Sequence, residues 1–211
     1  MSASSSFKVR HLVRALKKRY GEISWWPGDR DEVRIGPILT RQTRWENVTR
    51  APAELRSRGL CPVAALCPAD IRGIEEAIRC MGFFRIKAKR APSLTAHFTG
   101  SYGSVEAMEN VPTAVLRADL LSVNGIGEET ADSILCYGFS RTGFVIDAYT
   151  EKILQCIGTH TPRSSLKILF ERVLPCDNGV YRKAHAYIVE YAKEFCIKKR
   201  CEQCILVNSN G

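Results

Sequence analysis

The 211-residue sequence has no apolar run that approaches the roughly 20 residues needed for a membrane-spanning helix. The segment MSASSSFKVRHLVRALKKRY also lacks a signal-peptide core, because basic residues interrupt each of its apolar stretches. Alternating strand patterns are missing too, apart from the short run GFVIDAY. The lack of a long apolar run and of a signal-peptide core predicts an intracellular protein, in the cytoplasm, nucleoid or nucleus, that is not secreted and binds no membrane.

Apolar residues recur at helical spacing along nearly the whole chain, which predicts an all-α fold. The first helix, over residues 7–20, places Leu12, Val13, Leu16 and Tyr20 on one stripe opposite its basic residues. A second pattern carries Val33, Ile35, Ile38 and Leu39 after a possible cap at Asp29. Further helices are expected at residues 44–51 (ending at Pro52), 68–82, 87–98, 113–121, 130–139, 146–157, 164–174 and 180–195.

Acidic residues are few relative to basic ones: 22 Asp and Glu against 31 Lys and Arg give a net charge of +9. Residues 8–19 contain cations and no acid, and the stretch FFRIKAKR adds more positive charge. Such an excess favours a polyanionic partner, most often nucleic acid. The alternative is a basic protein in which the charge serves only solubility.

The stretch LLSVNGIGEETADSIL, residues 120–135, has the pattern of two short helices joined by a glycine turn. We expect one helix to end near Val123 and the next to begin near Glu128, with Gly125 and Gly127 between them permitting positive φ. Ile126 would anchor the turn in the core. The exposed amides could bind a DNA phosphate without reading sequence, although most such turns only cap a helix.

Asp147 lies 20 residues after Gly127, in the stretch GFVIDAYTEKIL. One interpretation is that this aspartate only caps the N-terminus of a helix. However, the hairpin, the helix ADSILCYGF, a short linker and VID occur in an order that resembles the helix-hairpin-helix DNA glycosylases of the endonuclease III group. PILTRQTRWENV and CMGFFRIKAKR resemble earlier segments of that superfamily, so the similarity spans nearly the whole chain.

The resemblance implies two helical lobes with a DNA-binding cleft, and a target base rotated out of the duplex into a pocket. The expected domains are residues 24–142, with the hairpin, and residues 1–23 together with 143–211, connected around Gly143. The protein is expected to bind double-stranded DNA as a monomer, with Gly125, Ile126, Gly127 and Thr130 at the DNA. Asp147 matches the aspartate that stabilises oxocarbenium charge at the sugar and can orient or deprotonate water.

Glu129 occupies the position at which bifunctional members of the resembled superfamily carry a lysine. That lysine forms a Schiff base with the sugar and permits strand cleavage, which a carboxylate cannot do. The sequence therefore predicts a monofunctional glycosylase without lyase activity, with Glu129 as a possible second catalytic-site group. Two other interpretations are that a lysine of FRIKAKR attacks instead, or that Glu128 and Glu129 only favour a helix N-terminus.

The three tryptophans are candidates for stacking on a flipped base, although core packing is their commoner role. Trp25, Trp26 and Pro27 stand together, and Trp45 follows later. These features resemble the 3-methyladenine DNA glycosylase III branch, which implies alkylated, cationic purines as substrates. Other residues match the polar wedge and its flanking DNA contacts: Gln42, Arg41 and Arg44. Alternatives are a thymine or uracil mismatch glycosylase and a non-catalytic DNA-binding module.

The chain has nine cysteines, an odd and scattered set that argues against a disulfide framework. Cys196, Cys201 and Cys204 lie close together, with four and two intervening residues, and resemble the iron–sulfur loop of endonuclease III. In that pattern a fourth cysteine would stand at Asn210. The resemblance implies a [4Fe–4S] cluster, with zinc or no metal as alternatives, and Cys176 or His185 could supply a fourth ligand.

Overall fold

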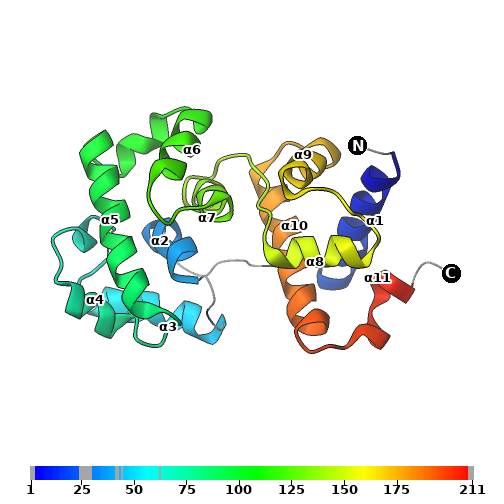
Figure 1. Cartoon of the computed structure of the whole chain (residues 1–211), viewed down its shortest axis with the longest axis horizontal. Helices are drawn as coiled ribbons and strands as arrows, with labels where there is room; N and C mark the ends of the chain where they lie inside the picture. Colours follow the sequence, from blue (N-terminus) through cyan, green and yellow to red (C-terminus); the bar gives the residue numbers. More distant parts are fainter. Residues whose placement is uncertain (1–2, 24–29, 41–42, 44, 62, 209–211) are drawn as a thin grey trace. The chain divides into compact units, whose positions relative to one another are not determined.

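The computed structural model describes residues 3–23, 30–40, 43, 45–61 and 63–208, and every regular element in these ranges is helical (Figure 1). The all-α prediction is therefore confirmed. The chain divides into two compact units, residues 26–141 and residues 1–25 with 142–211. Among the described helices, none combines the length and the apolar character that crossing a membrane requires.

The unit of residues 26–141 is built around one apolar core. Its α-helices are α2 (Arg30–Thr40), α3 (Trp45–Ser57), α4 (Ile71–Ala77), α5 (Phe84–Tyr102), α6 (Thr113–Ser122) and α7 (Glu128–Ser133). Short 3-10 turns, η1 (Val63–Leu66) and η2 (Glu106–Asn110), connect them, and a π-helical turn, η3 (Ile134–Gly138), continues α7. Leu94 and Phe98 of α5 are fully buried in this core, together with Leu116 and Leu120 of α6.

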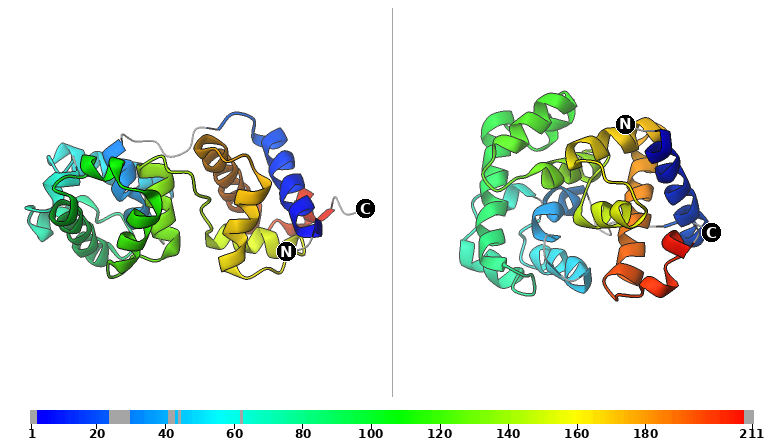
Figure 2. Two further views of the ribbon diagram at one scale, coloured as in Figure 1. Left: turned by 90° about the horizontal axis from the view of Figure 1, so that it is seen from above. Right: turned by 45° about the vertical axis from the view of Figure 1, so that its right-hand side comes forward.

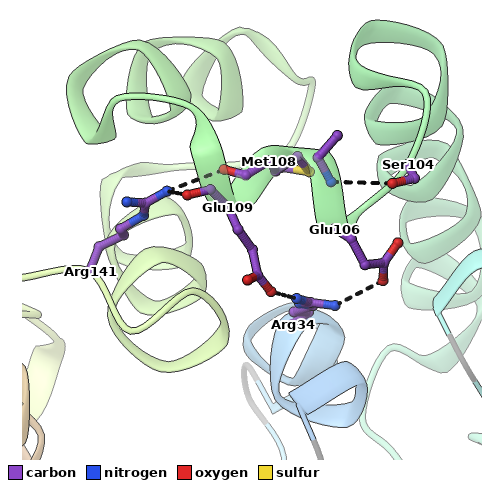
Figure 3. A network of polar contacts seen from close by, with 7 residues as sticks. Arg34, Ser104, Glu106, Met108, Glu109 and Arg141 are labelled. Carbon is purple, nitrogen blue, oxygen red and sulfur yellow. Dashed lines mark hydrogen bonds and ion pairs between the residues drawn. The ribbon is translucent and has the colours of Figure 1, made fainter.

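Helix α2 packs closely against η3, and a buried arginine lies at this contact. Arg34 is 3% exposed and pairs with Glu109 at 2.7 Å and with Glu106 at 3.4 Å (Figure 3). A Cβ added at Gly138 would lie 3.0 Å from the Arg34 Cα, so the glycine allows the two backbones to approach. Arg141 donates to the carbonyl of Val111 at 3.0 Å and to those of Met108 and Glu109, which joins η2 to the end of η3.

The other unit contains α1 (Ala3–Tyr20), α8 (Ala148–Cys156), α9 (Arg163–Val173) and α10 (Asn178–Tyr191), followed by a π-helical turn, η4 (Ala192–Cys196). Its last described elements are η5 (Cys201–Gln203) and α11 (Ile205–Asn208). Helix α1 lies against α9 and α10 (Figure 2). Its predicted stripe is confirmed, since Leu12 and Leu16 are buried in the unit's core and Val13 and Tyr20 pack against it.

The prediction that a helix ends at Pro52 is wrong, because α3 continues to Ser57 with Pro52 inside it. A proline inside a helix removes one backbone hydrogen bond and costs about 3 kcal/mol. Here the same helix buries Ala51 and Leu55 completely, or nearly so, in the core. The burial of these neighbours explains why the helix persists through the proline.

Candidate functional site

The glycine turn between α6 and α7 has the predicted hairpin geometry. Gly125 adopts φ of 88°, in the left-handed region that glycine tolerates, and the Ile126 amide donates to the Val123 carbonyl at 3.0 Å. Ile126 is buried in the core, as predicted. Gly127 does not use the positive φ that glycine permits: with φ of −96° it is the extended N-cap residue of α7. A residue at an N-cap ordinarily takes this conformation.

The surface of the hairpin is formed by its backbone and by two side chains. Asn124, Gly127 and Glu128 are exposed, and a Cβ added at Gly127 would meet nothing within 4 Å. Thr130, which the sequence analysis placed at the DNA, is only 2% exposed. Its side chain therefore belongs to the interior of this unit, while the turn before it is open to a ligand.

Arg90 of α5 lies directly on the hairpin. A Cβ added at Gly125 would stand 2.7 Å from the Arg90 Nε and 2.8 Å from its Cζ, so the guanidinium occupies the space beside this glycine. Arg90 is exposed, and no carboxylate in the described part of the chain pairs with it. The sequence marks Arg90 as one of several cations, but only the fold brings it to the hairpin, 35 residues away in sequence.

An ion pair fixes the two hairpin helices to each other. The Arg117 Nε of α6 donates to the Asp132 Oδ1 of α7 at 2.8 Å, and its Nη2 donates to Oδ2 at 3.2 Å. The Asp132 side chain is only 6% exposed, so this two-point contact is shielded from water on the acidic side. Glu129 lies part-exposed in the first turn of α7, and its neighbour Glu128 lies 3.6 Å from the Arg117 Nη2.

Asp147 is the N-cap residue of α8, which confirms the structural interpretation of this aspartate without excluding the catalytic one. Its Oδ1 accepts from the Thr150 amide and from the Thr150 hydroxyl, both at 2.7 Å. Its Oδ2 lies 3.5 Å from the His185 Nε2 on α10. The Asp147 side chain is 13% exposed and that of His185 is 8% exposed.

The Asp147 carboxylate is ionised despite this enclosure. Burial by itself raises its pKa, but the neighbouring His185, followed by the Thr150 amide and hydroxyl, outweighs burial and lowers the pKa. A carboxylate with a lowered pKa is a stable negative charge and a weak base. The geometry therefore suits stabilisation of positive charge better than removal of a proton from water.

Several predicted contacts lie outside the described residues: Trp25, Trp26, Pro27, Arg41, Gln42 and Arg44. Trp45 begins α3, but its side chain is also outside the described part. Thr43, between the predicted wedge and Arg44, accepts a hydrogen bond from the Lys87 Nζ at 2.6 Å. Lys87 is 5% exposed, and burial lowers its pKa to about 8. Lys87 belongs to FRIKAKR, one of whose lysines is an alternative attacking amine, but no local pattern in the sequence predicts its burial.

The C-terminal cysteines form no metal-binding group within the described residues. Cys204 is buried, and its Sγ accepts a hydrogen bond from the Tyr191 hydroxyl at 3.2 Å, while Cys201 is exposed. Nowhere in the described ranges do three His, Cys, Asp or Glu side chains lie close enough to hold one metal ion. Of the two possible fourth ligands, His185 faces Asp147 instead and Cys176 is exposed. As arranged, the described residues do not fit a cluster.

The chain carries a glycine hairpin between two helices and, in its other unit, an aspartate that caps a helix, as expected of the helix-hairpin-helix class of DNA glycosylases. Residues 35–176 match the family model described as HhH-GPD superfamily base excision DNA repair protein. This match covers more than half of the chain. The protein therefore belongs to the HhH-GPD superfamily.

Individual relatives agree with this assignment. The chain is 40% identical over 203 residues to the protein named "Putative DNA repair glycosylase MJ1434" of Methanocaldococcus jannaschii, covering 93% of this chain and 92% of the relative. It is 26% identical to endonuclease III of Thermotoga maritima, covering 95% and 91%. Among solved structures it is similar to H. pylori 3-methyladenine DNA glycosylase (MagIII) bound to 1,N6-ethenoadenine, with a TM-score of 0.77, 25% identity, and coverage of 90% and 97%.

Proposed function

We propose that this protein is a monofunctional DNA glycosylase that flips a damaged base out of duplex DNA and hydrolyses its N-glycosidic bond. The observation that carries this proposal is the ionised Asp147, held at the N-terminus of α8 by Thr150 and His185. Heterolysis of a glycosidic bond leaves positive charge on the sugar, and a fixed anion lowers the energy of that state. Such an enzyme acts on DNA inside the cell, in base excision repair.

Glu129 supports the hydrolytic mode. In the resembled superfamily, its position holds the lysine whose amine attacks the sugar. A carboxylate forms no imine, so water is the acceptor of the sugar and the DNA strand stays intact. Water adds to the sugar carbon as the base departs with the bonding electrons; a cationic base leaves as a neutral purine, and the proton lost by the water is released to solvent.

Alkylated purines are the proposed substrates. A purine alkylated at a ring nitrogen carries positive charge and is already a good leaving group, so it needs little acid catalysis. This requirement agrees with a site built on one ionised aspartate. The predicted aromatic group of Trp25, Trp26 and Pro27 would stack on a cationic base, and the similarity to a 3-methyladenine DNA glycosylase points in the same direction.

The proposal is tested by incubating the protein with duplexes that each contain one lesion, followed by alkali to reveal abasic sites. The panel contains N3- and N7-methylpurines, ethenoadenine, and uracil or thymine opposite guanine. We expect excision of the alkylated purines to be fastest, and strand breaks to appear only after alkali. Faster excision of uracil or thymine would favour a mismatch glycosylase, and no excision on any duplex would leave a DNA-binding module.

A further inference from the structure

The two oxygens of the Asp147 carboxylate have separate partners. Oδ1 is held by the amide and the hydroxyl of Thr150 within α8. Oδ2 has no role in capping and faces the His185 Nε2 of α10 at 3.5 Å. The orientation of the carboxylate is therefore set by two elements, and only one of them is the helix that it caps.

The imidazole of His185 is itself held in place by packing. Its ring meets the edge of Phe144 at a centroid distance of 6.3 Å and an interplanar angle of 81°. Phe144 is fully buried and stacks on Phe170 at 4.0 Å. Because this aromatic cluster belongs to the core of the unit, the imidazole is presented to Asp147 by a rigid support.

Other ionisable groups that the structure describes near this pair either stay neutral or have partners of their own. Tyr149 of α8 feels the Asp147 charge, but burial first and that charge second raise its pKa, so it remains neutral. Tyr181 of α10 is also neutral, since burial raises its pKa to about 12. On α9, Glu171 accepts from the Phe144 amide at 2.9 Å and lies 4.0 Å from the Lys167 Nζ, and therefore has partners of its own.

A carboxylate with so little exposure would be pushed toward its neutral form if no donor faced Oδ2. A neutral carboxyl group cannot stabilise an oxocarbenium ion by charge. We infer that His185 is a positioning residue for base excision: it holds Oδ2 and keeps Asp147 ionised in the enclosed site. This inference rests on the proposed function, because it assigns His185 a role through Asp147.

The sign of the expected pH effect follows from the contacts. Without a donor at Oδ2, Asp147 binds a proton at a higher pH than in the wild-type protein. The active, ionised form is then lost earlier as the pH falls. The acid limb of the pH–rate profile should therefore move to higher pH when His185 is replaced by an apolar residue. A neutral donor at position 185 should return the acid limb toward its wild-type position.

The experiment compares His185→Leu, which removes the donor, with His185→Gln, which keeps a donor that does not titrate. His160→Leu is the matched control, because His160 is an exposed histidine of the same unit. Single-turnover excision of the best substrate of the lesion panel is measured from about pH 5 to about pH 9, the range in which histidine and perturbed carboxyl groups titrate. DNA affinity and Tm are recorded for each variant.

We expect the acid limb of His185→Leu to move up by about one pH unit or more, which is a tenfold or greater loss of rate on that limb. DNA affinity should change little, His185→Gln should restore most of the profile, and His160→Leu should match the wild type. The inference would be overturned if His185→Leu folded and its acid limb did not move. It would also be overturned if His185→Leu lost excision rate equally at every pH, in proportion to its fall in Tm. Full excision activity of Asp147→Asn would overturn the proposed function and this inference together. If Asp147→Asn lost activity but the pH profile of His185→Leu matched the wild type, only the inference would be overturned.

Discussion

Among single residues, Glu129 distinguishes the two chemical modes of this superfamily. Its carboxylate stands where the resembled bifunctional enzymes carry the imine-forming lysine. We predict that borohydride traps no covalent protein–DNA adduct while the enzyme removes a base, because no amine attacks the sugar. The measurement is a denaturing gel of labelled lesion duplex, incubated with enzyme with and without borohydride.

Lys87 is the amine that could form such an adduct in place of the missing lysine. It is the buried amine whose pKa is lowered to about 8, so part of it is neutral and nucleophilic near that pH. A strong trapped band that disappears in Lys87→Arg would show that this lysine has replaced the missing one. Such a result would contradict the monofunctional mode.

At the level of secondary-structure elements, the approach of α2 to η3 depends on Gly138. A Cβ there would lie 3.0 Å from the Arg34 Cα, a backbone atom that cannot move aside without shifting α2. We predict that Gly138→Ala destabilises the protein by roughly 1–3 kcal/mol, the usual cost of overpacking. Chemical denaturation is the measurement.

Gly100 of α5 is the matched control for this substitution. A Cβ at that helical position would meet nothing within 4 Å, and its φ is not positive. Alanine should therefore stabilise the helix by about 0.5–1 kcal/mol. If both alanine variants lost stability equally, the close approach of α2 and η3 would not be the cause.

The hairpin and α5 together present one cation beside exposed backbone, and this arrangement predicts a phosphate contact by Arg90. Removal of one phosphate contact should reduce the slope of log K against log salt by about 0.9. We expect this reduction, with weaker binding, for Arg90→Ala and not for Lys89→Ala, the neighbouring exposed cation on the same helix. Fluorescence anisotropy on unmodified duplex at several salt concentrations is the measurement, and equal slopes for the two variants would refute the contact.

For the whole molecule, periodicity was sufficient to predict an all-α chain and most helix ends, because amphipathic stripes and caps are local features. The end of α6 near Val123 and the start of α7 at Glu128 are examples. Pro52 does not end its helix because the burial of Ala51 and Leu55 in α3 offsets the backbone hydrogen bond that the proline removes. Which of the two glycines adopts positive φ could not be predicted, because glycine is common both in turns and at N-caps.

The parts of the site that could not be predicted are contacts between segments far apart in sequence. His185 lies 38 residues from Asp147, and Arg90 lies 35 residues from Gly125. Neither pair has a spacing pattern, since the packing of α8 on α10 and of α5 beside the hairpin creates them. The cysteine loop shows the converse, because the close spacing of Cys196, Cys201 and Cys204 in sequence does not assemble a group of three metal-binding side chains within the described residues.

The central claim is that the charge of Asp147 drives base excision, and the comparison of wild type with Asp147→Asn tests it most directly. Asparagine is as good an N-cap as aspartate, so α8 should form and DNA binding should persist. With the charge removed, single-turnover excision of an alkylated purine from duplex DNA should fall by at least about a hundredfold. Excision at the wild-type rate by a folded Asp147→Asn variant would contradict the account.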